Sequence, residues 1–132
     1  MKFALFTKLD PQEDNNHIFS VFKSLKKHNL DFDIDSESFD LIYNLSNSKN
    51  FNFNKVEKLT NEYDYVISIG GDGTILRSAN EIGKLSIPII GLNKGRLGFL
   101  ANSPLESIDL ILRKLKKSEY NISERTIIQV EF

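Results

Sequence analysis

The residues best suited to chemistry are a run of glycines around one carboxylate, residues 70–74 (GGDGT). An apolar strand pattern precedes the run, and a helical pattern follows it. Glycine has no Cβ atom, so the backbone at Gly70, Gly71 and Gly73 can take a positive φ and bring its N–H groups close to a ligand. Thr74 is the predicted N-cap of the helix, whose positive dipole end would then face the ligand. The turn therefore predicts a site that binds phosphate groups.

Asp72 needs a separate explanation, because phosphates repel a neighbouring carboxylate. The carboxylate would either take a proton from an attacking hydroxyl group or hold a metal ion. The alternative is a tight turn in which an Asp is present only for its conformational preference. The position of Asp72 between a strand and a helix favours the chemical role.

Two better-known phosphate-binding signatures do not fit these residues. The turn is not followed by the Gly-Lys-Ser/Thr sequence of a P-loop. A dinucleotide fingerprint would need a third glycine and, about 20 positions on, an acidic residue, but the chain has Leu76 and Leu92 at these places. A hydride-transferring Rossmann domain is therefore disfavoured, whereas a related open α/β sheet is not.

A second glycine-rich segment, residues 91–100 (GLNKGRLGFL), directly follows the apolar run 87–90. Two junctions of this kind indicate neighbouring parallel strands that end at one edge of a sheet, where open α/β sheets bind their ligands. Strand and helix patterns alternate along the chain. We therefore expect an α/β fold with an open, mostly parallel, Rossmann-like sheet and flanking helices.

The two motifs together resemble the N-terminal domain of NAD kinases. The first motif alone is shared with diacylglycerol kinases and is similar to a loop of 6-phosphofructokinases. Here it continues as residues 75–77 (ILR), as in NAD kinases, whereas diacylglycerol kinases typically continue with Asn-Glu. The resemblance extends over essentially the whole chain and is most specific over residues 63–99, and residues 123–126 (SERT) also look familial.

The resemblance implies phosphoryl transfer from ATP to the 2′-hydroxyl of the adenosine ribose in NAD, which gives NADP. Mg²⁺ or another divalent cation would bridge the donor phosphates, and no residue is assigned as a metal ligand. Asp72 would be the catalytic proton acceptor, Arg77 would contact NAD, and Leu76 would flank the adenine together with Phe99. The residues expected to bind nucleotide are Gly70, Gly71, Asp72, Gly73, Thr74, Leu76, Arg77, Asn93, Gly95 and Phe99.

Three of these residues have simpler explanations. Leu76 and Phe99 are apolar and could belong to the hydrophobic core. Arg77 could be a solvated residue on the helix surface.

The composition excludes several other kinds of site. The chain has 132 residues, 40% of them hydrophobic, and a formal net charge of −1, which allows one core and gives no attraction to nucleic acid or an anionic membrane. It contains no Cys, and its two histidines, His17 and His28, do not make a zinc site. The sequence predicts neither a signal peptide nor a membrane span. We therefore expect a cytoplasmic protein whose partners are NAD and ATP, with no nucleic-acid or membrane partner.

Local patterns predict the first elements of the fold. A strand over residues 1–7 precedes a helix whose buried side recurs at helical spacing. A short strand over residues 40–43 and a surface loop over residues 44–54 follow. The apolar residues of that first helix are Ile18, Phe19, Phe22 and Leu25.

A further helix is predicted after the second glycine motif. Ser103 and Glu106 form a capping-box pattern, with Pro104 at the first helical position. The buried stripe of this helix comprises Leu105, Ile108, Ile111, Leu112 and Leu115.

The last residues predict the start of another domain. Residues 126–132 alternate as a strand with its apolar side chains on one face. In NAD kinases the matching segment enters a β-rich domain that supplies further NAD contacts and much of the oligomer interface. We therefore expect a nucleotide-binding domain over residues 1–122, the start of a C-terminal domain over 123–132, and a homo-oligomer at full length. The 132-residue chain alone is expected to be inactive. A diacylglycerol-kinase-like lipid kinase domain and a non-catalytic nucleotide-binding module remain as alternatives.

Overall fold

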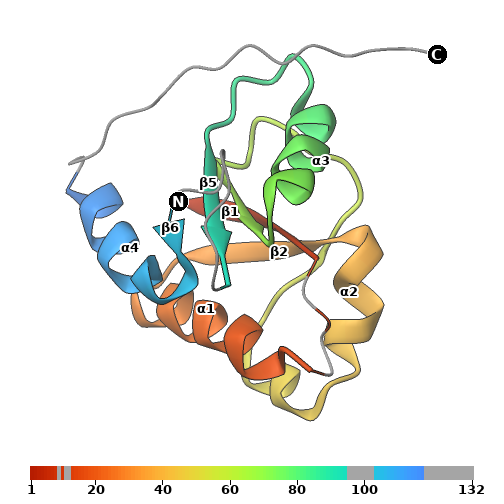
Figure 1. Ribbon diagram of the computed structural model, residues 1–132, viewed down its shortest axis with the longest axis vertical. Helices are drawn as coiled ribbons and strands as arrows, with labels where there is room; N and C mark the ends of the chain where they lie inside the picture. The colour runs from red at the N-terminus through yellow and green to blue at the C-terminus, as the bar shows by residue number, and fades with distance from the viewer. Residues whose placement is uncertain (9, 11–12, 95–102, 118–132) are drawn as a thin grey trace.

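The computed structural model describes residues 1–8, 10, 13–94 and 103–117 of the chain. Among these residues, six parallel strands form one sheet in the order β3-β2-β1-β4-β5-β6 (Figure 1). The strands are β1 (Lys2–Thr7), β2 (Asp31–Asp35), β3 (Lys55–Val56), β4 (Tyr65–Ile69), β5 (Ile89–Asn93) and β6 (Ser103–Pro104). The helices are α1 (Asn15–Lys27), α2 (Ser36–Tyr43), α3 (Asp72–Ile82) and α4 (Ile108–Lys116), with the 3₁₀ helices η1 (Ser46–Asn50) and η2 (Leu105–Ser107).

The order of the strands changes direction between β1 and β4. The chain passes from β1 to β2 and β3 on one side, and then places β4, β5 and β6 on the other side of β1. The pairing of β1 with β4 runs from Phe3 opposite Tyr65 to Thr7 opposite Ile69. Open α/β sheets bind ligands at the carboxyl ends of the strands where such a change occurs. The fold therefore points to the loops that follow Thr7 and Ile69.

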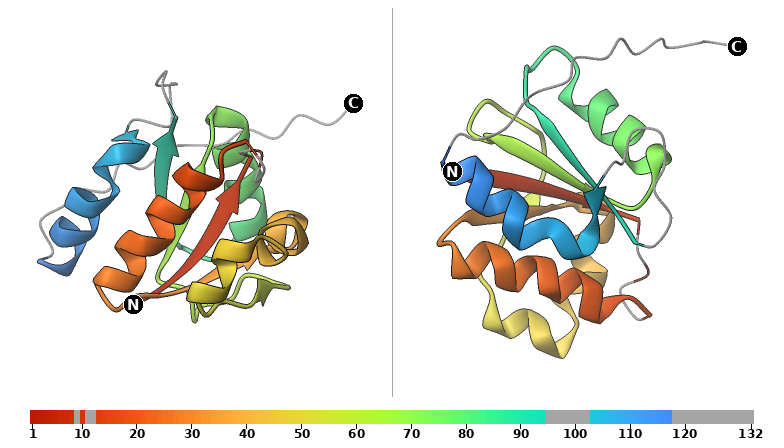
Figure 2. Two further views of the ribbon diagram at one scale, coloured as in Figure 1. Left: turned by 90° about the horizontal axis from the view of Figure 1, so that it is seen from below. Right: turned by 60° about the vertical axis from the view of Figure 1, so that its left-hand side comes forward.

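Helices cover both faces of the sheet (Figure 2). On one face, Phe22 of α1 and Leu112 of α4 are fully buried in a cluster that includes Leu5 of β1. On the other face, Ile82 of α3 belongs to a smaller cluster with Phe6 of β1. Because both faces are covered, the central strands are nearly continuous apolar runs, as parallel sheets require. The predicted α/β fold with a parallel sheet is confirmed.

The first predicted strand and helix are also confirmed. Residues Phe3 to Thr7 of β1 are all buried. Helix α1 buries the four predicted apolar residues and Val21 beside them. Lys26 and Lys27 lie in its last turn, where the helix dipole favours cations.

The expected strand over residues 40–43 is wrong, because these residues form the end of α2. The carboxylate of Asp35 accepts a hydrogen bond from the N–H of Glu37 and caps this helix, which favours a helical start. Leu41 and Tyr43 are 57% and 60% exposed, so the apolar residues here form no buried strand face. The strand of this region is β2, which lies directly before α2 and is not among the predicted elements.

The expected surface loop over residues 44–54 is only partly correct. The segment contains η1, and the hydroxyl of the buried Ser48 donates a hydrogen bond to the carbonyl of Tyr43. Phe51 and Phe53 pack against the main core. These aromatic rings draw the Asn-rich segment onto the protein, because burying them removes a large apolar area from water.

Helix α4 begins later than the capping-box pattern predicted. Ser103 and Pro104 form β6 and pair with the end of β5, so the helix starts at Ile108 without a side-chain cap. The predicted stripe is confirmed: Leu105, Ile108, Leu112 and Leu115 are buried and Ile111 is partly buried. The predicted strand over residues 126–132 and the domain boundary after residue 122 lie outside the described residues. Within the described residues, no helix has the length and apolar character needed to cross a membrane.

Candidate active site

The glycine turn joins the end of β4 to the start of α3. Helix α3 begins at Asp72, and its N-cap is Gly71, not Thr74 as the sequence predicted. The N–H of Thr74 donates a hydrogen bond to the carbonyl of Gly71, so Thr74 already lies inside the first turn. The helix thus starts three residues earlier than predicted, which places the Asp72 carboxylate at the positive end of the helix dipole.

The three glycines of the turn have different reasons to be glycine. Only Gly70 has a positive φ, of 150°, and a Cβ atom on it would lie 2.6 Å from Oγ1 of Thr74. Gly71 is extended, with a φ of −123°, and a Cβ atom there would contact nothing within 4 Å. Gly73 belongs to the helix. The expected positive φ is therefore confirmed at Gly70 and wrong at Gly71 and Gly73. The space beside Gly71 is open among the described residues.

Asp72 is the first residue of α3 and is partly buried. It lies directly after the sheet edge at which β1 and β4 end. The N–H groups at the start of a helix have no acceptor within that helix, and they attract anions to the same place. The carboxylate and an anion-binding helix terminus therefore share one position.

The second glycine motif reaches the same sheet edge, as predicted. Strand β5 pairs in parallel with β4 and places Leu92 opposite Ile69. The carbonyl of Leu92 accepts a hydrogen bond from the N–H of Gly70. Asn93 is the last residue of β5 and is partly buried. Because β5 pairs with β4 up to Leu92, Asn93 lies beside the glycine turn. Two further predicted binding residues, Gly95 and Phe99, lie outside the described residues.

An ion pair connects the second motif to the start of α1. The ammonium of Lys94, directly after β5, pairs with the carboxylate of Asp14, the N-cap of α1. Asp14 also accepts a hydrogen bond from the N–H of Asp10 at 3.0 Å. The hydrogen bond from Lys94 is the main reason that the pKa of Asp14 lies below its ordinary value. The two segments after β1 and β5 are thereby held together across the sheet edge.

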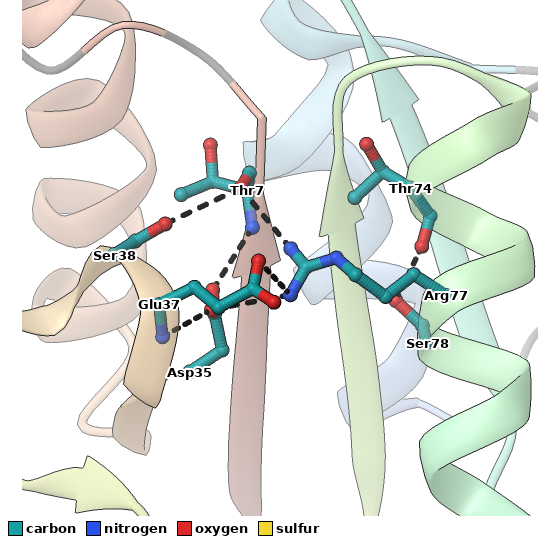
Figure 3. Close-up of polar contacts among 7 residues, drawn as sticks. All are labelled: Thr7, Asp35, Glu37, Ser38, Thr74, Arg77 and Ser78. Carbon is teal, nitrogen blue, oxygen red and sulfur yellow. Dashed lines mark hydrogen bonds and ion pairs between the residues drawn. The ribbon is translucent and has the colours of Figure 1, made fainter.

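Arg77 is bound within the chain by several groups (Figure 3). Its guanidinium forms an ion pair with Asp35 at 3.3 Å and with Glu37 at 3.1 Å. It also donates a hydrogen bond to the carbonyl of Thr7 and lies 5.3 Å from the centroid of the Phe6 ring. The alternative that Arg77 is a solvated helix residue is therefore wrong, because its side chain joins α3 to β1 and to the start of α2.

Asp35 is the centre of this arrangement and is only 2% exposed. Besides the ion pair with Arg77, its carboxylate accepts hydrogen bonds from the N–H groups of Thr7 and Glu37. A buried carboxylate needs such partners, because burial without them strongly disfavours its charge. The carboxyl ends of β1 and β2 and the second turn of α3 are thus fixed relative to one another.

Residues 15–120 match the family described as the ATP-NAD kinase N-terminal domain. The chain belongs to this family. Membership confirms the resemblance that the two glycine motifs carried. The matched residues include the turn at Asp72.

Curated relatives of the family align with nearly the whole chain. NAD kinase of Bacteroides fragilis is 35% identical to 98% of this chain, and NAD kinase of Christiangramia forsetii is 34% identical to 99% of it. In both comparisons the chain spans 45% of the length of the relative. A crystal structure of yeast NADH kinase complexed with NADH has a TM-score of 0.69 at 15% identity, covering 90% of this chain and 38% of the yeast chain. The last comparison independently confirms the fold.

Leu76 is an exposed residue of the family domain. It is 47% exposed on α3, one turn after Asp72, so the alternative that it is a core residue is wrong. An exposed leucine beside the glycine turn suits an apolar contact such as a nucleotide base. Its predicted contact with adenine remains a prediction.

The described residues contain no group of three or more His, Cys, Asp or Glu side chains that could hold a metal ion. Among the predicted nucleotide-binding residues that the structure describes, Asp72 is the one carboxylate. This arrangement fits Mg²⁺, which commonly binds one or two carboxylates together with substrate phosphates and water.

Two residues of this sheet edge, Asp35 and Lys8, are absent from the set of site residues predicted from the sequence. Asp35 stands in the alternating segment Asp31–Asp35, whose apolar residues at every second position indicate a strand. Lys8 follows the first strand directly, and a residue at the carboxyl end of the first strand of an α/β sheet is well placed to contact a ligand. Neither residue lies in a glycine motif.

Proposed function

We propose that the chain is the nucleotide-binding half of an NAD kinase, which transfers a phosphoryl group from ATP to the 2′-hydroxyl of the adenosine ribose in NAD. The single observation that carries the proposal is the position of Asp72. It lies at the start of α3, beside the change in strand order between β1 and β4, in a chain of the ATP-NAD kinase N-terminal domain family.

Asp72 acts in this proposal as the general base. A ribose hydroxyl is a poor nucleophile at neutral pH, and a positioned carboxylate that accepts its proton increases the rate by about 10²- to 10⁴-fold. The remaining work of phosphoryl transfer is positioning and neutralisation of charge. The N–H groups at the start of α3 serve the second purpose without a large cationic surface.

The other predicted residues hold the nucleotides. Gly71 leaves open space for a ligand, and Gly70, Gly73 and Thr74 shape the turn around it. Mg²⁺ bound with the donor phosphates would neutralise part of their charge. Leu76 contacts the adenine. Asn93 and Arg77, together with the predicted Gly95 and Phe99, complete the set.

The proposal extends to the rest of the protein. The nucleotide-binding domain would span residues 1–122, and a C-terminal domain would supply further NAD contacts. The full protein is a cytoplasmic homo-oligomer.

The experiment that tests this function supplies two acceptors to a protein that carries this chain together with a C-terminal domain. Purified protein is incubated with Mg²⁺, ATP and either NAD or diacylglycerol, and NADP and phosphatidic acid are measured. NADP formation without lipid phosphorylation supports the proposal. Lipid phosphorylation would assign the chain to the diacylglycerol-kinase-like alternative, and the absence of both products would favour a non-catalytic nucleotide-binding module.

A further inference from the structure

The carboxyl ends of β1 and β2 carry a cluster of ionised side chains around Arg77 (Figure 3). The guanidinium lies 3.3 Å from a carboxylate oxygen of Asp35 and 3.1 Å from one of Glu37. Its Nη2 atom donates a hydrogen bond of 3.3 Å to the carbonyl of Thr7, the last residue of β1. Contacts with the ends of both strands and with the first turn of α2 therefore fix the position of the guanidinium.

The two carboxylates contribute in different ways. The side chain of Asp35 is 3% exposed and also accepts hydrogen bonds from two backbone N–H groups, so it is a fixed partner that orients the guanidinium. The side chain of Glu37 is 71% exposed, so its contribution is mainly its charge. Because two negative charges face the one positive charge of Arg77, the three side chains together carry a net negative charge.

Further acidic side chains lie around the same place. Among the described residues, a cavity of about 60 Å³ beside Arg77 is lined by four carboxylates and two cations. A net negative charge repels anions over roughly a Debye length, about 8 Å at physiological ionic strength. This corner of the sheet edge therefore disfavours a phosphate group although it contains an arginine. The carboxylates are those of Asp35, Glu37, Glu57 and Glu81, and the cations are Lys58 and Arg77.

The separation between Arg77 and Asp72 makes this charge relevant to the reaction. The two residues are five positions apart on α3, and a rise of 1.5 Å per residue separates them by about 7.5 Å along the helix axis. In the proposed function the acceptor gains a phosphate with about two negative charges beside Asp72. An arginine without counter-ions at this distance would attract the product more strongly than the substrate, whereas an arginine with two carboxylates around it does not.

We propose that Asp35 and Glu37 set the nucleotide specificity of this sheet edge. Asp35 positions the guanidinium, and the two carboxylates cancel its charge. Arg77 therefore offers hydrogen-bond donors to an uncharged part of the acceptor, and the 2′-phosphorylated product is not retained. The role of the 2′-phosphate rests on the proposed function, whereas the cancelled charge rests on the contacts described above.

The test compares the affinities for NAD and NADP, measured by calorimetry on the protein that carries this chain together with a C-terminal domain. Glu37→Gln keeps the size of the side chain and removes one negative charge. NADP should then bind about twofold to tenfold more tightly, while the affinity for NAD changes less. Glu62→Gln is the matched control, because Glu62 is 59% exposed and pairs with Lys2 at the opposite, amino end of β1. The control should leave the ratio of the two affinities unchanged.

A second variant tests whether the charge of Arg77 is the source of the effect. Addition of Arg77→Met to Glu37→Gln should remove the gain in NADP affinity, and urea unfolding shows whether the double variant is folded. An affinity ratio that does not change with Glu37→Gln, or that changes equally with Glu62→Gln, would overturn the inference. A gain that persists without Arg77, or no binding of either nucleotide, would overturn it as well.

The formation of NADP separates this inference from the proposed function. NADP formation by a protein whose affinity ratio does not respond to Glu37→Gln would overturn the inference and leave the kinase function standing. A ratio that depends on Glu37, in a protein that forms no NADP, would support the cancelled charge and refute the proposed kinase function instead.

Discussion

Replacement of Gly70 by alanine should destabilise the chain more than any other single-methyl addition in the turn. A backbone φ of 150° is strained for a residue with a Cβ atom, at about 1–3 kcal/mol. The new methyl group would also lie 2.6 Å from Oγ1 of Thr74, well inside the separation of roughly 3.5 Å at which nonbonded atoms attract, and overpacking of this kind costs about 1–3 kcal/mol. We expect Gly70→Ala to lower the free energy of unfolding by about 2–6 kcal/mol in total.

The assay is equilibrium unfolding in urea, with Gly71→Ala as the matched control. A methyl group on Gly71 meets no atom within 4 Å, so this variant should remain within about 0.5 kcal/mol of the unsubstituted chain. Any loss of nucleotide affinity in Gly71→Ala would then reflect a clash between the new methyl group and the nucleotide, and not a change in the stability of the fold.

A double-mutant cycle separates the two contributions at Gly70. Thr74→Ala removes the Oγ1 atom, so Gly70→Ala should cost about 1–2 kcal/mol less in that background, leaving mainly the backbone strain. A Gly70→Ala chain as stable as the unsubstituted one, or a cycle without coupling, would refute the geometry assigned to the turn.

Three further predictions concern the ion pair of Asp35, stability in acid and the exposed Leu76. Asp35→Asn and Arg77→Met should each lower the free energy of unfolding by about 2–3 kcal/mol, and the double variant should lose clearly less than the sum in urea unfolding, because both remove the same ion pair. Acid should destabilise the chain as the pH falls below the ordinary carboxyl range. The hydrogen bond from Lys94 lowers the folded-state pKa of Asp14, and the hydrogen bond between His28 at the end of α1 and Asp109 of α4 does the same for Asp109. Stability from such groups is present above the unfolded pKa and lost as the pH falls through the folded one, so Asp14→Asn and Asp109→Asn should flatten the acid limb of stability against pH. Leu76→Ser should leave the free energy of unfolding within about 0.5 kcal/mol while it weakens NAD binding measured by calorimetry.

The sequence predicted that the two glycine segments meet at one sheet edge, because the patterns that indicate this are local. The turn around Asp72 and the end of β5 both combine an apolar strand with glycines, and a parallel sheet brings such junctions to one edge. The pattern also predicted the buried faces of α1 and α4, since helical spacing of apolar residues depends on no distant partner.

The missed features depend on contacts between distant residues. Asp35 and Arg77 are 42 positions apart, and no local pattern pairs them. The strand Asp31–Asp35 has an aspartate at every second position, and these carboxylates enter the fold only because distant residues pair with Asp33 and Asp35. Threonine is a preferred N-cap residue, which favours Thr74 from the sequence alone. In the structure the extended Gly71 is the N-cap, so α3 starts earlier.

The most direct test of the central claim is the turnover of Asp72→Asn in the protein with its C-terminal domain, at saturating NAD, ATP and Mg²⁺. The account predicts a fall in kcat of about 10²- to 10⁴-fold with NAD affinity much less affected, because the hydroxyl proton moves only in the chemical step. Glu81→Gln, which neutralises an exposed carboxylate near the other end of the same helix, should retain full turnover. An Asp72→Asn protein that keeps more than about a tenth of the unsubstituted kcat would contradict the role of Asp72 as the base.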